Sequence, residues 1–249
     1  MGQGSVREFI TRFQNVRDLG WVKSRRANNT GIGKTLEDLM EIDENNIDGP
    51  DLGDVEIKSQ RALTSSKLTL FTKKPTGPNG ANTVLRDKYG KQNPTHPDLM
   101  QIHASMFNYW NSTFDRWGMR LKPNDDDERI YLQIKDLETD EVESFTCWYD
   151  YDVIRQVIAK KLKILAFVSA DSRTVEGWEQ FRFTQCKLFH GGSFERFLGL
   201  MNSGKIQYDI RIGSYKTPGK NYGKVHDHGS GFRIARGNMP ELFEGSVEL

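Results

Sequence analysis

Apolar side chains recur at helical spacing in two segments near the start of the chain. The first stripe, within residues 5–16, consists of Val6, Phe9, Ile10 and Phe13. The second, within residues 31–40, consists of Ile32, Leu36, Leu39 and Met40. Residues three and four apart lie on one face of a helix, so both segments are predicted to be amphipathic helices, with Ser5 capping the first.

Alternation of apolar and polar side chains predicts strands in the rest of the chain. Segment 67–73 is predicted to be the antiparallel neighbour of a strand near residue 56, and an acidic turn at 124–128 precedes a predicted hairpin. The other predicted strands lie at 129–134, 143–149, 163–170 and 182–188, with helices at 151–162 and 194–201. This succession predicts an α/β fold in which helices flank a mixed sheet.

Charge and cysteine content narrow the class of protein. The formal charge is +1, because 35 basic residues nearly balance 34 acidic ones. Any affinity for nucleic acid therefore requires a local basic patch. Cys147 and Cys186 are too few for a zinc site and are predicted to be structural thiols of a reduced, cytoplasmic protein. Residues 1–13 lack the apolar core of a signal peptide, and no stretch approaches the roughly 20 apolar residues of a membrane span.

The strongest chemical signal lies in residues 49–58, which read Gly-Pro-Asp-Leu-Gly-Asp-Val-Glu-Ile-Lys. Side chains alternate along a strand, so Glu56 and Lys58 point the same way while their apolar neighbours point into the protein. Asp51 lies in the turn that leads in, where its carboxylate can approach that of Glu56. Two carboxylates beside one ammonium group suit metal-assisted phosphodiester hydrolysis, because the carboxylates hold the cation and the lysine orients water.

The same residues allow two other interpretations. Acidic and basic side chains on an exposed strand face usually form weak ion pairs in solvent. By strict alternation Asp54 shares the face of Glu56 and Lys58, so Asp54 competes with Asp51 as the second metal ligand.

This segment resembles the Pro-Asp…Glu-x-Lys signature of the restriction-endonuclease superfamily, formed here by Pro50, Asp51, Glu56 and Lys58. The chain as a whole resembles the MvaI/BcnI group of Type II restriction endonucleases, in its length, in the position of the motif and in a C-terminal segment rich in Arg, His and Asp. That group shares its fold with the mismatch-repair nickase MutH. The resemblance implies a restriction-endonuclease/MutH-like catalytic core.

The resemblance and a change in residue composition along the chain together predict two lobes. Residues 1–170 are expected to form a catalytic lobe and residues 171–249 a DNA-recognition lobe, with a soft boundary near residue 170 and DNA in the cleft between them.

Individual roles follow from the resemblance. The family's spacing selects Asp51 rather than Asp54, so Asp51, Glu56 and the main-chain carbonyl of Ile57 are implied as metal ligands, and Lys58 as the residue that positions water. The implied cation is Mg²⁺, with Mn²⁺ able to replace it and Ca²⁺ supporting DNA binding only.

Glu37 lies beside the apolar stripe of the second predicted helix. The resemblance implies that Glu37 is a third acidic residue of the active site. A solvated helix glutamate is the alternative, because residues at the boundary of an amphipathic helix can face either way.

The resemblance also places base recognition in the C-terminal segment. Arginine can donate two hydrogen bonds to guanine, aspartate can accept one from cytosine, and histidine can donate to guanine. Asp209 and Arg211 are predicted to share one face of a strand, which suits a G·C pair, with a surface ion pair as the alternative. The full set of candidate DNA-binding residues is Asp209, Arg211, Tyr215, His226, His228, Arg233 and Arg236.

Two further motifs allow a chemical interpretation. For the run His226-Asp227-His228, metal ligands and a structural turn compete with base contacts, and the resemblance favours base contacts. The run Thr-Gly-Ile-Gly-Lys-Thr at 30–35 is not a phosphate-binding loop, because Asn28 stands where that motif requires its first glycine.

Two polar segments carry clustered cations. Residues 18–31 include Lys23, Arg25 and Arg26 and are predicted to form a loop that faces phosphate groups. Residues 74–98 are rich in Pro, Gly and Asn and are predicted to form a long loop. The cations expected to contact the DNA backbone from that loop are Arg86, Lys88 and Lys91. An aromatic run at 107–117 is predicted to belong to the core.

The expected partner is double-stranded DNA, with no membrane and no obligate protein partner. The resemblance implies a bacterial, cytoplasmic enzyme that acts as a monomer on a short pseudopalindrome of the CCWGG kind, where W is A or T. The alternatives are a MutH-like repair nickase, a sequence-specific DNA-binding protein without catalysis, and a metal-dependent phosphoesterase centred on His226 and His228.

Overall fold

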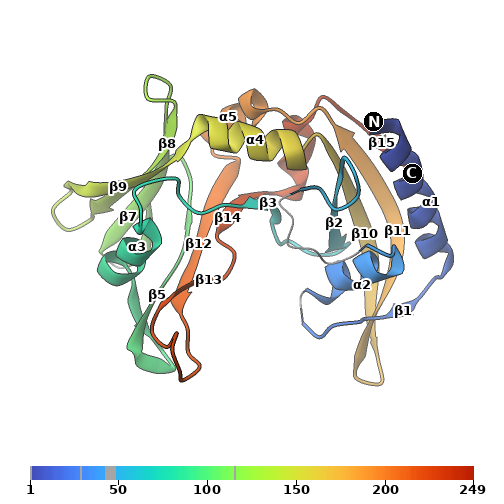
Figure 1. The fold of residues 1–249 in the computed structure, drawn as a ribbon, viewed down its shortest axis with the longest axis horizontal. Coiled ribbons are helices and arrows are strands. Elements are labelled where there is room, and N and C mark those ends of the chain that lie inside the picture. Colours follow the sequence, from blue (N-terminus) through green and yellow to red (C-terminus); the bar gives the residue numbers. More distant parts are fainter. Residues whose placement is uncertain (1, 29, 43–48, 115) are drawn as a thin grey trace. The chain divides into compact units, whose positions relative to one another are not determined.

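The computed structural model describes residues 2–28, 30–42, 49–114 and 116–249 (Figure 1). Its helices are α1 (Gly2–Asp18), α2 (Gly31–Leu39), α3 (Ala81–Tyr89), α4 (Tyr151–Lys161), α5 (Phe194–Asn202) and the 3-10 helix η1 (Arg236–Leu242). Its strands are β1 (Val22–Lys23), β2 (Val55–Arg61), β3 (Leu68–Thr72), β4 (Lys91–Asn93), β5 (His96–Met106), β6 (Asn111–Phe114), β7 (Trp117–Asn124), β8 (Arg129–Asp136), β9 (Val142–Asp150), β10 (Ile164–Val175), β11 (Trp178–His190), β12 (Ile206–Ser214), β13 (Val225–Asp227), β14 (Gly231–Ile234) and β15 (Gly245–Glu248).

The chain divides into two compact units, each assembled from separate stretches of sequence. The first unit contains residues 1–66, 157–193 and 240–249, and the second contains residues 67–156 and 194–239. This division differs from the expected boundary near residue 170. The physical reason is that β10 runs through that point and pairs with β11 on both sides of it.

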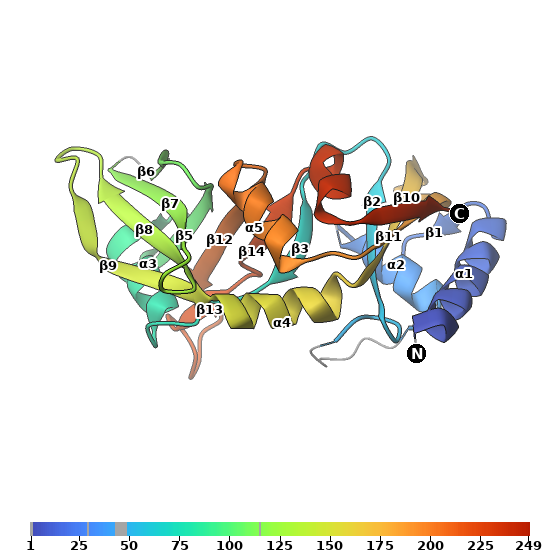
Figure 2. The ribbon, with the colours of Figure 1, turned by 90° about the horizontal axis from the view of Figure 1, so that it is seen from above.

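The first unit is built on a mixed sheet in the order β1-β11-β10-β2, with β15 also paired to β11. β10 is parallel to β2 and antiparallel to β11, which confirms the predicted α/β class. The two predicted helices, α1 and α2, both contribute to the hydrophobic core on one face of this sheet (Figure 2). That core is formed by residues from both helices and from β2, β10 and β11, among them Phe9, Phe13, Ile32, Leu36, Val55, Ile57, Ala166, Val168, Phe181 and Phe183.

The start of α1 differs from its prediction. The helix begins at Gly2, so Ser5 lies within the first turns and is not the residue that caps them. Ser5 instead packs against Gly53, in the turn before β2, where a side chain would collide with Ser5. Gly53 has φ of 58°, a conformation that residues with a Cβ rarely adopt. The glycine therefore lets α1 approach the turn that carries Asp51.

The second unit contains two sheets. One has the order β3-β14-β12-β5-β4, with β13 also paired to β12, and the other has the order β6-β7-β8-β9. The predicted hairpin is confirmed as β8 and β9, and the acidic turn at 125–128 joins β7 to β8. The prediction that residues 67–73 pair with the motif strand is wrong, since β3 pairs with β14 and the neighbour of β2 is β10. β10 is a buried, apolar strand, the kind that a parallel position favours.

Residues 74–98 are not a long loop, because they include α3 and β4. Arg86 is buried and donates hydrogen bonds to Ser214 Oγ and to the carbonyl of Gly223, so it holds α3 to β12 and is not placed to contact DNA. Lys88 pairs with Glu143 at 2.6 Å. This segment is rich in Pro, Gly and Asn, which favour loops, but the packing of α3 outweighs that propensity.

The aromatic run at 107–117 is not part of the fully buried core. Tyr109 keeps 53% of its surface exposed, and Trp110 lies beneath the guanidinium of Arg120, at 4.2 Å. The side chain of Phe114 lies outside the described residues.

Both cysteines are buried and free, as predicted for structural thiols. Burial raises the pKa of each thiol to about 12, so neither is a ready nucleophile. In the described part of the chain, no helix is long and apolar enough to cross a bilayer.

Candidate active site and recognition surface

The face of β2 that opposes the hydrophobic core carries Glu56 and Lys58. Alternation places the two side chains together, and Lys58 Nζ lies 2.5 Å from Glu56 Oε1. The Glu56 side chain is only 2% exposed, whereas Lys58 is 26% exposed. The interpretation of a solvated surface pair is therefore wrong for Glu56, which is a buried carboxylate in contact with a partly exposed ammonium group.

The electrostatics of Glu56 are those of a buried carboxylate beside both an ammonium group and a second carboxylate. Burial raises the pKa of Glu56, the ammonium group of Lys58 opposes this effect, and the nearby carboxylate of Asp51 adds to it. Glu56 Oε2 is buried and has no hydrogen-bond partner among the described residues. A buried oxygen that is left without a donor, next to a second carboxylate, fits a divalent cation better than any neutral group.

Asp51 is fixed to the strand from the turn before it. Its Oδ2 accepts a hydrogen bond from the main-chain N–H of Ile57 at 2.7 Å. The N–H and C=O of one strand residue point to the same side, so the carbonyl of Ile57 also faces the Asp51 side, away from β10. Asp54 pairs with Lys163 instead, since its Oδ2 lies 3.6 Å from Lys163 Nζ. The structure thus groups Asp51, Glu56 and the Ile57 carbonyl and leaves Asp54 apart from them.

Glu37 lies on α2, which packs on β2 through Gly33. A Cβ placed on Gly33 would lie 3.8 Å from Ser59 Oγ and 3.9 Å from Glu37 Oε1. Glu37 is therefore near the strand that carries the motif, and its part in the chemistry remains a prediction.

A second lysine adjoins the site, and no sequence pattern selects it. Lys161, at the end of α4, has its Nζ 4.0 Å from Glu56 Oε1. α4 leads into β10, which is parallel to β2, so the end of the helix falls beside the start of the motif strand. Among the described residues, no three His, Cys, Asp or Glu side chains cluster as a ready metal site.

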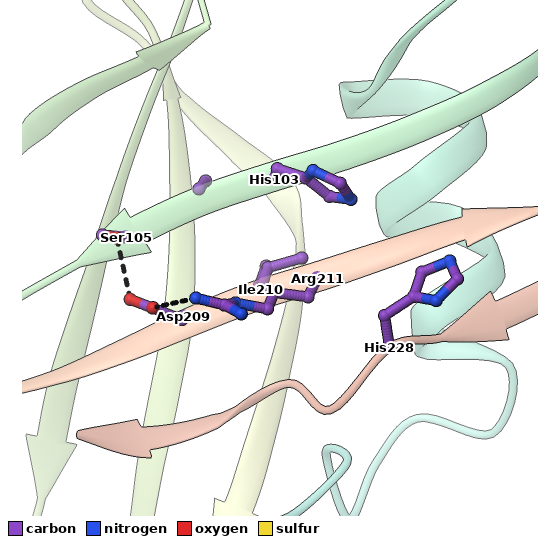
Figure 3. A pocket seen from close by; sticks show the side chains of 7 residues that line it. His103, Ser105, Asp209, Ile210, Arg211 and His228 are labelled. Carbon is purple, nitrogen blue, oxygen red and sulfur yellow. Dashed lines mark hydrogen bonds and ion pairs between the residues drawn. The ribbon is translucent and has the colours of Figure 1, made fainter. Parts of the chain in front are cut away.

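A second polar site lies in the other unit, on the face of β12 that points away from its apolar core. The residues of this recognition surface come from β12, from its neighbours β5 and β14, and from the turn after β13. They are His103, Ser105, Gln207, Asp209, Arg211, His228 and Arg233. Figure 3 shows the pocket at its centre, with His103 and His228 on either side of Arg211.

Asp209 lies at the centre of this surface, with hydrogen bonds to one oxygen and two guanidinium groups beside the other. Its Oδ1 accepts hydrogen bonds from Ser105 Oγ at 2.7 Å and from Gln207 Nε2 at 2.5 Å. Its Oδ2 lies 3.1 Å from Arg233 Nε and 3.5 Å from Arg211 Nη2. The Asp209 side chain is 10% exposed, so this is not the solvated surface pair that was the alternative. The acceptor positions of Oδ1 are thus in use, whereas Oδ2 faces the two guanidinium groups through charge, and Arg233 Nε has no hydrogen-bond partner among the described residues.

Histidine and tyrosine rings extend the surface beyond Arg211. Tyr215 stacks on His226 with centroids 4.2 Å apart, and His226 contacts His228 at the same distance. Burial and the neighbouring histidines lower the pKa of His228, so its ring is neutral near pH 7 and can both donate and accept. Asp227 accepts hydrogen bonds from the N–H groups of residues 229 and 230, which makes it a turn residue. Arg236 begins η1 and is not among the residues that line the pocket.

His103, Ser105 and Gln207 were not predicted as site residues. Their signal in the sequence is weak: His103 and Ser105 alternate with Ile102 and Met106, which is the pattern of a half-buried strand. Their position opposite Arg211 and Asp209 depends on the register of β5 with β12, which no local pattern reveals.

Comparison with known families and structures decides between the candidate classes. The model of the MvaI/BcnI restriction endonuclease family matches residues 10–243. The chain belongs to this family. The MvaI/BcnI restriction endonucleases are Type II site-specific deoxyribonucleases, so the chain is an enzyme, and a DNA-binding protein without catalysis is excluded. A comparison with curated proteins gave no match.

Two solved structures are similar to this MvaI/BcnI family member over nearly its whole length. One is restriction endonuclease MvaI in complex with its cognate DNA substrate, with 34% identity, 96% of this chain and 95% of that chain covered, and a TM-score of 0.86. The other is MvaI in the absence of DNA, with 33% identity, coverage of 98% and 97%, and a TM-score of 0.64. The fold of this chain is thus the fold of a restriction endonuclease, as the motif in β2 predicted.

Substitution at the two competing aspartates should separate them sharply. Asp51→Asn is expected to reduce DNA cleavage more than about a hundredfold. With Asp51 assigned as a metal ligand, the change removes a charge that would hold the cation, and a bound cation supplies several kcal/mol of transition-state stabilisation. The amide oxygen can still accept from the N–H of Ile57, so the turn should survive. Asp54→Asn should cleave within about twofold of wild type, since it loses only a weak pair with Lys163. Equal losses in initial rate for the two variants would contradict the assignment.

Proposed function

We propose that this protein is a Mg²⁺-dependent endonuclease that hydrolyses duplex DNA at a short pseudopalindrome of the CCWGG kind, as a monomer that cuts one strand at a time. The observation that carries this proposal is the state of Glu56: one oxygen is paired with Lys58, and the other is buried without a donor among the described residues, near a second carboxylate.

The residues that would hold the cation are Asp51, Glu56 and the main-chain carbonyl of Ile57. All three supply hard oxygen atoms, which suit Mg²⁺ and Mn²⁺, and Ca²⁺ should fill the site without supporting hydrolysis. A divalent cation bound there lowers the pKa of the attacking water and neutralises charge on the phosphate group.

Lys58 and Lys161 supply the positive charge of the protein itself. Lys58 Nζ donates to Glu56 Oε1, and its partly exposed ammonium group retains donors for a water molecule or a phosphate oxygen. Lys161, 4.0 Å from the same carboxylate oxygen, helps to keep Glu56 ionised in its buried position. Glu37, on α2, is proposed as a third acidic residue of the active site.

The unit that contains β12 is proposed to read the bases. Arg211 and Arg233 flank Asp209, so two guanidinium groups lie side by side on one surface. Arginine is the side chain that most often reads guanine, and a CCWGG half-site presents two adjacent guanines. We assign these guanines to the two arginines, with His226, His228 and Tyr215 as contacts to other bases and Arg236 as a contact to the DNA backbone.

A monomer is proposed because the described residues of one chain carry both a motif strand and a surface for reading bases. With a single active site, the enzyme hydrolyses one strand, dissociates or reorients, and then cuts the other. Cutting one strand at a time distinguishes such a monomer from dimeric enzymes, whose twofold symmetry mirrors the palindrome and which cut both strands in one complex.

A plasmid with one CCWGG site tests the function directly. With Mg²⁺ and limiting enzyme, nicked circles are expected to accumulate before linear DNA, and the initial rate should be first order in protein. A matched plasmid in which the site is altered should remain supercoiled. Parallel reactions with Mn²⁺ should cut and those with Ca²⁺ should not, and sequencing the ends identifies the target.

Three outcomes would contradict parts of the proposal. Nicked circles that never become linear would indicate a repair nickase like MutH. Linear DNA that forms without a nicked intermediate, with a rate that rises as the square of protein concentration, would indicate a dimer. Cutting of the altered plasmid at an equal rate would show that the CCWGG kind of target is wrong.

A further inference from the structure

The long ribbon formed by β10 and β11 extends beyond the strand that carries the active site. β2 is paired with β10 only as far as Arg61 and Ala170, whereas β10 and β11 remain paired to Val175 and Trp178 (Figure 1). The five residues beyond Ala170 span about 17 Å at the usual rise of a strand. This extension is a feature that the proposed active site and recognition surface do not use.

The register of the sheet shows which side chains of the ribbon share the face of the catalytic residues. Glu56 and Lys58 lie opposite Leu165 and Phe167, and every second residue along β10 continues on that face. Residues directly opposite one another in an antiparallel pair also share a face, which adds β11 and β1. Beyond Ala170 this face consists of Lys23, Asp171, Arg173, Val175, Trp178, Gln180 and Arg182, and we call it the ribbon surface.

Aromatic rings hold the cations of the ribbon surface in place. Lys23 Nζ lies 3.6 Å from the ring centroid of Trp178, and the guanidinium carbon of Arg173 lies 4.1 Å from that of Trp21. Trp178 is 54% exposed, which is unusual for so large an apolar side chain. Contacts of this kind fix cations without neutralising them, because the rings carry no net charge.

The ribbon surface is positively charged. Lys23, Arg173 and Arg182 face a single carboxylate on this surface, that of Asp171, which lies 2.7 Å from Arg182. Arg173 donates to a neutral group, Gln180 Oε1, at 2.9 Å. Two cations, Lys23 and Arg173, thus stand beside aromatic rings on the same sheet face as Glu56 and Lys58.

We propose that the ribbon surface binds backbone phosphates of the duplex that occupies the active site, outside the base pairs that are read. The inference rests on the proposed function, because a duplex bound over Glu56 and Lys58 presents its phosphates to this face of the sheet. Lysine and arginine on such a surface neutralise phosphate charge without reading sequence. Arg173 lies six residues beyond Phe167, or about 20 Å along β10, and Lys23 is level with it, so the contact falls outside a five-base-pair site.

The test uses the double variant Lys23→Gln, Arg173→Gln, with binding measured by anisotropy in Ca²⁺ over a range of KCl concentrations. On a duplex of about 30 base pairs, the slope of log K against log salt should become less steep by about 1.8, which is 0.9 for each lost phosphate contact. Affinity for cognate and random duplexes should fall by the same factor. On a capped duplex of about 10 base pairs, which reaches about 17 Å to either side of its centre, the variant should match wild type.

Arg7→Gln is the matched control, because Arg7 is an exposed arginine on α1, the helix that packs on the opposite face of the sheet. Its salt slope should equal that of wild type on both duplexes. An unchanged slope for the double variant, with normal specific cleavage by wild type, would overturn the ribbon proposal and leave the function intact. Wild-type protein that neither binds nor cuts duplex DNA would instead overturn the proposed function. A double variant that changes self-association in light scattering but not the salt slope would show a protein interface and overturn the proposal.

Discussion

Glu56→Gln is expected to lose DNA cleavage by about a thousandfold or more while making the cation-free protein more stable. Replacing the carboxylate by an amide of the same shape removes a metal ligand, and such a ligand supports several kcal/mol of transition-state stabilisation. Specific binding in Ca²⁺ should weaken far less, because the recognition surface lies in the other unit. The measurement is single-turnover cleavage beside an anisotropy titration.

The gain in stability follows from the burial of Glu56. Burial raises the pKa of this group above its ordinary value, so the folded protein favours the protonated form. That contribution is fully present below the ordinary glutamate pKa and is lost as the pH rises through the raised pKa. Glutamine carries no charge at any pH. The variant should therefore exceed wild type in free energy of unfolding by about 0.5–2 kcal/mol near pH 8, with the difference shrinking toward pH 5.

Urea unfolding in EDTA across this pH range measures the effect, and Glu248→Gln provides the control. Glu248 is on β15, with 80% of its side chain exposed and a long contact to Lys187 of 3.3 Å. Its replacement should change neither cleavage nor the pH dependence of stability. If Glu56→Gln is less stable than wild type at every pH, the contact with Lys58 outweighs the cost of burying the Glu56 carboxylate. Glu56 would then not be destabilising in the absence of a cation, which contradicts the prediction.

The catalytic strand was predictable because its defining features are local. Asp51, Glu56 and Lys58 fall within one turn and one strand, and the alternation that pairs Glu56 with Lys58 needs no other part of the chain. The helices α1 and α2 were predictable for the same reason, since their apolar stripes depend only on spacing. Alternation alone left Asp54 as a rival of Asp51, and the family's spacing selected Asp51; the structure places Asp54 beside Lys163.

Features that depend on pairing between distant segments could not be predicted. Ile57 pairs with Ala166, so neither the parallel neighbour of β2 nor the position of Lys161 follows from any local pattern. The same holds for the surroundings of Asp209, because the register of β5 with β12 brings Ser105 against its Oδ1. The two units exchange segments along the chain, so a single boundary could not describe them.

Asp209→Asn is expected to relax specificity at two base pairs at once, because Asp209 orients two arginines. Its Oδ2 faces both Arg211 and Arg233, and its Oδ1 is held by Ser105 and Gln207. An asparagine can keep the contact with Ser105 but loses the charge that aligns the guanidinium groups. Each arginine–guanine pair contributes about 1–3 kcal/mol of discrimination, so the preference for cognate over random DNA should fall by about 2–6 kcal/mol.

Competition binding in Ca²⁺ against sites with one altered base pair distinguishes an orienting residue from a direct base contact. For Asp209→Asn the penalty for a wrong base should shrink at both G·C positions read by the arginines, whereas loss of a cytosine contact would relax one position alone. Arg233→Ala should relax one position, and its combination with Asp209→Asn should cost less than the sum of the two single changes. Ser105→Ala, which removes one hydrogen bond to Asp209 Oδ1, should show the same pattern with a smaller loss of about 0.5–1.5 kcal/mol. Strict additivity of the Asp209 and Arg233 changes, together with relaxation at a single base pair, would show that Asp209 reads a base directly.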